Sequence, residues 1–103
     1  MAVDLAALGS QSAPQRRRWD STDSILYALG VGAGTGDLAL TTEHSVGVPQ
    51  RALPTMAVVV GGSDPALINR VDAFDPASIV HGTQELELHA PFPVGGEVES
   101  TSR

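Results

Sequence analysis

Apolar and polar residues alternate most regularly along residues 79–90. In an extended chain, Val80, Leu86 and Leu88 fall on one face, while the histidine and glutamate residues fall on the other. A period of two is the pattern of a β-strand that has one face against a core and one face in water. The alternation therefore predicts a strand over residues 79–90, with Leu86 and Leu88 buried.

Residues 20–30 carry the strongest helix pattern in the chain. Asp20 or Ser21 can cap the first turn, because both side chains accept hydrogen bonds from free backbone N–H groups. Gly30 is a natural C-terminal stop. Between these ends, apolar residues recur at helical spacing and predict a buried stripe. The stripe consists of Ile25, Leu26 and Leu29.

Three further segments have apolar patterns that favour short strands. Residues 38–43 and the beginning of a strand in residues 97–103 are two of them. Residues 53–60 form the most hydrophobic run, and its valines favour a buried strand. Periodicity leaves a short buried helix open for this run. We expect residues 53–60 to share one core with Leu86 and Leu88.

Shorter signals predict turns of helix. Leu5 and Leu8 can support one helical turn near the N-terminus. Residues 63–65 (Ser-Asp-Pro) and 74–76 (Phe-Asp-Pro) both look like helix starts, because a capping residue precedes a proline.

Composition limits the classes of protein to consider. The chain has 103 residues, 42% of them apolar, which fits one domain with a core. It has no cysteine, which excludes disulfides and thiolate metal sites. A net charge of −6, with arginine as the only cation, argues against nucleic acid and anionic membranes as partners. With no apolar run of membrane-spanning length and no secretory pattern, we expect a cytoplasmic protein.

Two sequence features resemble phosphate-binding elements and were tested as such. Residues 30–37 hold four alternating glycines, but the spacing fails the dinucleotide fingerprint, and a Walker loop would need a lysine. The favoured interpretation is that these glycines form the loop that leaves the preceding helix and pack tightly against a neighbouring segment. Residues 16–18 are all arginine, and we interpret them as a solvated segment or the outward face of a short strand rather than a polyphosphate or nucleic-acid patch.

Catalytic groups are scarce. His44 and His89 are expected to face solvent, and the alternating Glu85, Glu87 and His89 do not converge well enough to bind a metal. No nucleophile motif or carboxylate pair stands out, so we assign no catalytic residue and no metal site. His81 remains, beside a glycine where a ligand could approach the backbone.

Taken together and in order, several segments resemble the N-terminal half of the hydratase 2, or MaoC-like dehydratase, family. Members of this family are R-specific 2-enoyl-CoA hydratases, also called (3R)-3-hydroxyacyl-CoA dehydratases. The resemblance covers residues 16–103 and leaves residues 1–15 as an N-terminal extension. It rests on residues 27–33 (Tyr-Ala-Leu-Gly-Val-Gly-Ala), 42–43 (Thr-Glu), 53–55 (Leu-Pro-Thr) and 80–93 (Val-His-Gly-Thr-Gln-Glu-Leu-Glu-Leu-His-Ala-Pro-Phe-Pro).

The resemblance implies an α+β hot-dog fold, in which an antiparallel sheet wraps around a helix. The N-terminal unit of the family shapes the acyl pocket, and its His-Gly contact with acyl-CoA maps onto His81 and Gly82. The catalytic motif Asp-x-Asn-Pro-aliphatic-His belongs to a second hot-dog unit and is absent from these 103 residues. We expect a hot-dog domain that is incomplete at its C-terminus.

The same resemblance implies the partners and the function. The CoA thioester is the substrate and no further cofactor is expected. A second hot-dog unit, in the same protein or in another chain, would complete a dimer-like pair. The leading interpretation is the acyl-CoA-binding part of a hydratase. The alternative is a non-catalytic hot-dog module that binds acyl thioesters or holds a catalytic partner.

Overall fold

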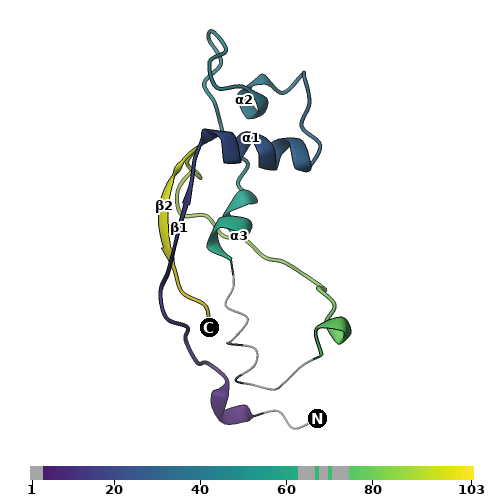
Figure 1. Ribbon diagram of the computed structural model, residues 1–103, viewed down its shortest axis with the longest axis vertical. Coiled ribbons are helices and arrows are strands. Elements are labelled where there is room, and N and C mark those ends of the chain that lie inside the picture. The colour runs from purple at the N-terminus through teal and green to yellow at the C-terminus, as the bar shows by residue number, and fades with distance from the viewer. Residues whose placement is uncertain (1–3, 63–66, 68–69, 71–74) are drawn as a thin grey trace.

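The computed structural model describes residues 4–62, 67, 70 and 75–103, and it has both helices and strands (Figure 1). Its two strands, β1 (Gln15–Trp19) and β2 (Gly96–Ser100), form one antiparallel sheet, and helix α3 (Met56–Gly61) packs against both of them. This confirms the α+β class and is compatible with part of a hot-dog fold. In chain order the elements are η1 Leu5–Ala7, β1 Gln15–Trp19, α1 Ser21–Gly30, α2 Leu38–Thr41, α3 Met56–Gly61, η2 Pro76–Ser78 and β2 Gly96–Ser100, where η marks a 3-10 helix.

The sheet confirms the interpretation of the arginine run and of the last strand. β1 and β2 pair so that Arg16 lies opposite Glu99 and Arg18 lies opposite Glu97. The Arg18 Nε atom is 3.2 Å from the Glu97 Oε2 atom, and both side chains are exposed. Opposite charges across an antiparallel pair stabilise the register modestly. Arg16 and Arg18 therefore lie on the outer surface of the sheet, whereas Arg17 lies on the side of α3 and donates to the Val59 carbonyl oxygen at 3.5 Å.

A small core lies where α3 meets the sheet. Trp19, Met56 and Val60 are buried there, and Phe92 packs on the outside of the cluster. The Trp19 and Phe92 rings stack with centroids 5.0 Å apart. The indole Nε1–H donates to the Pro93 carbonyl oxygen at 3.1 Å. Trp19 thus connects the sheet, α3 and the segment that precedes β2.

Helix α1 confirms the predicted helix and its cap, but its buried face differs from the prediction. Asp20 and Asp23 form a capping box, in which each side chain accepts a hydrogen bond from the other residue's backbone N–H. The buried residues are Ser24 and Ala28, whereas Leu26 is 61% exposed. The Ser24 hydroxyl donates to the Val94 carbonyl oxygen at 2.6 Å. A small polar residue fits this close backbone approach, so the leucines of the expected stripe face outward.

The strand predicted over residues 38–43 is wrong, because residues 38–41 form helix α2. Two threonine hydroxyls bond back to carbonyl oxygens four residues earlier, Thr41 to Asp37 at 2.9 Å and Thr42 to Leu38 at 2.6 Å. The helical turn itself is made by the backbone, where the Thr41 N–H donates to the Asp37 carbonyl oxygen at 3.0 Å and the Thr42 N–H to the Leu38 carbonyl oxygen at 3.1 Å. These backbone bonds need no neighbouring strand.

Most of the hydrophobic run at residues 53–60 also forms a helix rather than the expected strand. Residues 56–61 form α3, the alternative that periodicity left open. Its buried residues Met56 and Val60 are one helical turn apart, so they share the face that meets the sheet.

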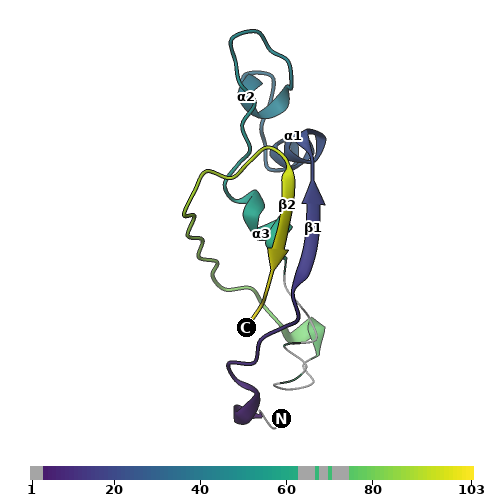
Figure 2. The ribbon, with the colours of Figure 1, turned by 90° about the vertical axis from the view of Figure 1, so that its left-hand side faces the viewer.

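The strand predicted over residues 79–90 is not formed. The segment is an extended loop, set apart from the β1–β2 pair in Figure 2. Leu86 and Leu88 are 43% and 39% exposed, so they do not share a core with α3 as expected. The physical reason is pairing: a strand needs a partner for its backbone groups, and in the described part of the chain β1 and β2 pair only with each other.

The remaining local predictions have mixed outcomes. Helical turns form at η1 and at η2, where the Asp75 carboxylate accepts from the Ala77 N–H at 3.0 Å. The helix start at residues 63–65 lies outside the described residues, as does Phe74. The glycine loop leaves α1 as expected, and Gly32 has a φ of +108°, which favours glycine. The loop is not tightly packed, since a Cβ on any of its glycines would meet nothing within 4 Å.

The described helices are also too short or too polar to cross a membrane.

Candidate functional site

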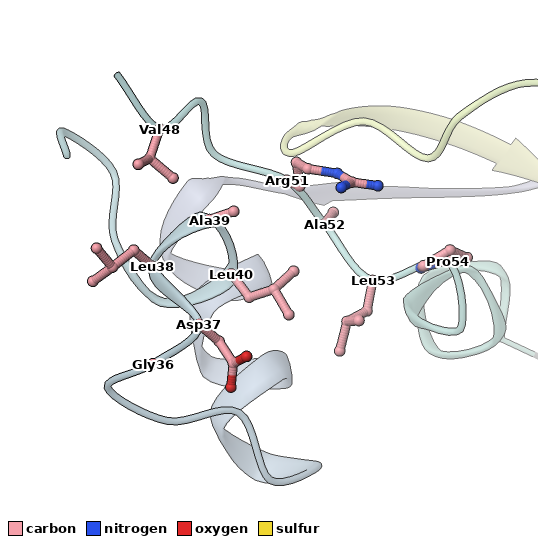
Figure 3. A pocket seen from close by; sticks show the side chains of 10 residues that line it. All are labelled: Gly36, Asp37, Leu38, Ala39, Leu40, Val48, Arg51, Ala52, Leu53 and Pro54. Carbon is pink, nitrogen blue, oxygen red and sulfur yellow. The ribbon is translucent and has the colours of Figure 1, made fainter. Parts of the chain in front are cut away.

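A hollow lies between α2 and residues 51–54, and we call it the α2 hollow (Figure 3). It has a volume of about 560 Å³, within the range of small-molecule sites. Its apolar lining includes Leu38, Leu40 and Leu53, and Figure 3 shows the Leu40 and Leu53 side chains pointing toward one another. An apolar surface of this kind suits a hydrocarbon chain.

Local hydrogen bonds hold the two walls of the α2 hollow together. The Arg51 backbone N–H donates to the Ala39 carbonyl oxygen at 2.7 Å, which ties the 51–54 segment to α2. The Asp37 carboxylate accepts from the Gly34 N–H at 2.9 Å, so it closes the turn before α2. One backbone hydrogen bond therefore joins the two walls, and the leucine side chains of the lining take no part in it.

A second hollow lies on the other side of residues 51–54, and we call it the Phe92 hollow. It has a volume of about 360 Å³ and is lined by Leu88 and Phe92 among others. The two hollows share three lining residues, Arg51, Ala52 and Pro54. The 51–54 segment is thus a wall between two apolar surfaces, with one cationic side chain on it.

The residues predicted to contact acyl-CoA lie in the extended loop. The His81 Nε2–H donates to the Thr83 carbonyl oxygen at 2.7 Å, and the residue is exposed. A Cβ on Gly82 would meet nothing within 4 Å. His81 and Gly82 line neither the α2 hollow nor the Phe92 hollow. Their role in substrate binding remains a prediction.

The other histidines lie as expected. His44 is exposed in a loop. The His89 Nδ1 atom is 3.9 Å from the Glu87 Oε1 atom, and both side chains are 85% exposed. In the part of the chain that the structure describes, no three His, Asp or Glu side chains gather in a metal-binding arrangement.

Sequence reasoning missed the α2 hollow and Arg51. The signal in the sequence is a single arginine in a loop between two apolar segments, residues 38–40 and 53–60. That pattern becomes informative only when α2 is placed against the loop.

Residues 18–103 match the family model described as MFE-2 hydratase 2 N-terminal domain. The chain belongs to this family. Several proteins similar to this chain are named as hydratases or dehydratases. It is 46% identical over 98 residues to 3-hydroxyacyl-thioester dehydratase Y of Mycobacterium tuberculosis, a match that covers 95% of this chain and 33% of the relative.

Two further relatives of this hydratase 2 domain are more distant. Enoyl-CoA hydratase ChsH3 of Mycobacterium tuberculosis is 28% identical over 109 residues, covering all of this chain and 38% of the relative. Peroxisomal multifunctional enzyme type 2 of Mus musculus is 33% identical over 104 residues, covering 92% of this chain and 14% of the relative. The chain therefore spans about a third of the length of the dehydratase, 38% of ChsH3 and 14% of the multifunctional enzyme.

Proposed function

We propose that this chain is the acyl-binding N-terminal part of an R-specific enoyl-CoA hydratase, or (3R)-3-hydroxyacyl-CoA dehydratase, that acts on fatty-acyl or related thioesters. The observation that carries the proposal is the family match over residues 18–103. The relatives' names, a 3-hydroxyacyl-thioester dehydratase and an enoyl-CoA hydratase, support the reaction class.

The α2 hollow is the surface on which we place the acyl chain. Its leucine-lined wall can remove methylene groups from water, and each fully buried methylene contributes about 0.8 kcal/mol. That value corresponds to at most about a fourfold gain in affinity per methylene group. His81 and Gly82 would contact the thioester portion of the same ligand, as the family resemblance implies.

The proton-transfer groups of the reaction are placed elsewhere. Hydration needs a general base that takes a proton from water while the water oxygen bonds to C3, and an acid that protonates C2. Backbone N–H groups would stabilise the charge that develops on the thioester oxygen. We propose that a second hot-dog unit supplies these groups, in the same protein or in another chain, and that no cofactor is needed beyond the CoA of the substrate.

The binding role is tested with enoyl-CoAs of increasing length. Crotonyl-CoA, trans-2-octenoyl-CoA and trans-2-dodecenoyl-CoA are titrated into the 103-residue chain by calorimetry. We expect the dissociation constant to fall with chain length, and we expect Leu40→Gln to weaken the longest ligand most, because it places an amide in the apolar wall. Leu26→Gln is the matched control, since Leu26 is 61% exposed on α1.

Two outcomes would redirect the proposal. Affinity that does not depend on acyl length would remove the α2 hollow as the acyl site. A chain that binds no thioester but restores hydration when mixed with a catalytic hot-dog unit would support a scaffolding module. In the enoyl absorbance assay we expect no turnover from the 103-residue chain alone, because the Asp-x-Asn-Pro-aliphatic-His motif is absent from these residues.

A further inference from the structure

We propose that Arg51 binds the anionic part of an acyl ligand whose hydrocarbon chain lies in the α2 hollow. This inference rests on the proposed acyl-binding function and adds to it a named charge contact. The ligand class is an anionic amphiphile. Its anion could be a phosphate of CoA or the carboxylate of a free fatty acid, which present the same chemistry to a guanidinium group.

The position of Arg51 carries the first part of the argument. Arg51 lines both the α2 hollow and the Phe92 hollow, so this cationic residue lies at the boundary of two apolar surfaces. Figure 3 shows the Arg51 side chain extending away from α2 along the edge of the hollow. The Asp37 carboxylate, the other charged group on the lining, lies on the opposite side of the hollow and accepts the Gly34 N–H.

The contacts of the β1 arginines differ from those of Arg51. On the sheet, Arg16 and Arg18 lie within 4.0 Å of glutamate carboxylates. Arg17 donates to the Val59 carbonyl oxygen at 3.5 Å. Within residues 4–62, 67, 70 and 75–103, no carboxylate lies within 4.0 Å of the Arg51 guanidinium, although the chain has twelve acidic residues.

The net charge of the chain also favours a role for Arg51 in anion binding. At −6 the chain repels anions in general, so an anionic ligand needs a local cation beside its apolar binding surface. Arg51 meets that need, because a guanidinium group has five N–H donors in a fixed planar arrangement. The backbone N–H of Arg51, rather than its side chain, makes the bond to Ala39, so the side chain can be replaced without breaking the wall.

The test compares three decanoyl ligands on the 103-residue chain at low ionic strength. Decanoyl-CoA carries phosphates, decanoate carries a carboxylate, and S-decanoyl-N-acetylcysteamine is a neutral thioester. The variants are Arg51→Gln, Arg51→Lys as the charge-retaining rescue, and Arg18→Gln as a control that removes the same charge on the sheet surface. Melting curves verify that each variant is folded.

We expect Arg51→Gln to weaken an anionic ligand about fivefold, the upper range for an exposed ion pair. Arg51→Lys should retain most of the affinity, Arg18→Gln should have little effect, and the neutral thioester should bind all variants equally. If only decanoyl-CoA responds, the anion is a CoA phosphate; if decanoate responds, it is a carboxylate. Both results support the inference.

Other results would overturn it. Equal weakening of all three ligands by Arg51→Gln would show that Arg51 only shapes the hollow. No weakening by Arg51→Gln, or the same weakening by Arg18→Gln, would show that this contact does not exist. Binding of the neutral thioester in either case leaves the proposed function standing, whereas a wild-type chain that binds no ligand overturns both.

Discussion

Replacing Trp19 by phenylalanine tests whether the small core is the structural centre of this chain. Trp19 is 7% exposed and lies between the sheet and α3. Its ring stacks on Phe92, and its N–H donates to the Pro93 carbonyl oxygen. Phenylalanine keeps an aromatic ring for the stack but removes the donor and one of the two fused rings.

The magnitude follows from these two losses. The hydrogen bond contributes about 1 kcal/mol, and the Pro93 carbonyl is left without this donor. The smaller ring leaves a partly filled cavity that costs about another 1 kcal/mol. Since domains of this size have total stabilities of only about 5–15 kcal/mol, a loss of about 2 kcal/mol is large. It should lower the melting temperature by roughly 10 °C.

The assay is urea denaturation followed by far-UV circular dichroism. Fluorescence is unsuitable because Trp19 is the only tryptophan. Leu26→Ala is the control, since an exposed side chain should change the unfolding free energy by less than about 0.5 kcal/mol. A Trp19→Phe midpoint equal to that of the wild type would refute the assignment of this core.

Two further predictions concern the cap of α1 and the loop that carries the predicted acyl-CoA contacts. Asp20→Ala should cost about 1 kcal/mol in the same denaturation experiment, while Asp20→Asn should be nearly neutral, because asparagine can still accept the N–H bond of the capping box. Gly82→Val should leave the melting temperature unchanged, since its Cβ meets nothing within 4 Å, yet raise the dissociation constant for enoyl-CoA if a ligand lies against that backbone. His81→Ala should likewise affect binding more than stability, because within the described residues the His81 ring is hydrogen-bonded to the nearby Thr83 carbonyl oxygen and to no distant segment. A lower melting temperature with unchanged binding would instead assign His81 a structural role.

The elements that sequence predicts well are those set by local contacts. Helix α1 begins at a capping box formed by Asp20 and Asp23, three residues apart, so its start is fixed within one turn of chain. The outward arginines of β1 are predictable for a related reason, since charged side chains in a strand favour the solvated face. The buried face of α1 could not be predicted in this way, because Ser24 is buried where its hydroxyl donates to the carbonyl oxygen of Val94, seventy residues later in the sequence.

Helix and strand compete wherever an apolar run is short. Residues 38–41 and 56–61 both form helices, although their leucines and valines are also typical of strands. The outcome depends on whether a strand edge is available to satisfy the backbone, and local helical hydrogen bonds need no such edge. The α2 hollow depends on this outcome, so the candidate site could not be assembled from the sequence pattern.

The alternating segment at residues 79–90 also shows that a strand needs a neighbouring strand, because here a strand pattern stays an extended loop. Its apolar face is exposed, with Val80 at 87% and Leu86 at 43%, and the chain as a whole has a radius of gyration of 17.2 Å. A compact domain of this length would have about 13 Å. Burying such a face against another sheet would contribute favourably at about 25 cal/mol per Å². Pairing along the edge of a neighbouring strand would give the backbone N–H and C=O groups hydrogen-bond partners. The exposed alternation thus supports our proposal of a second hot-dog unit, which would pack on this face.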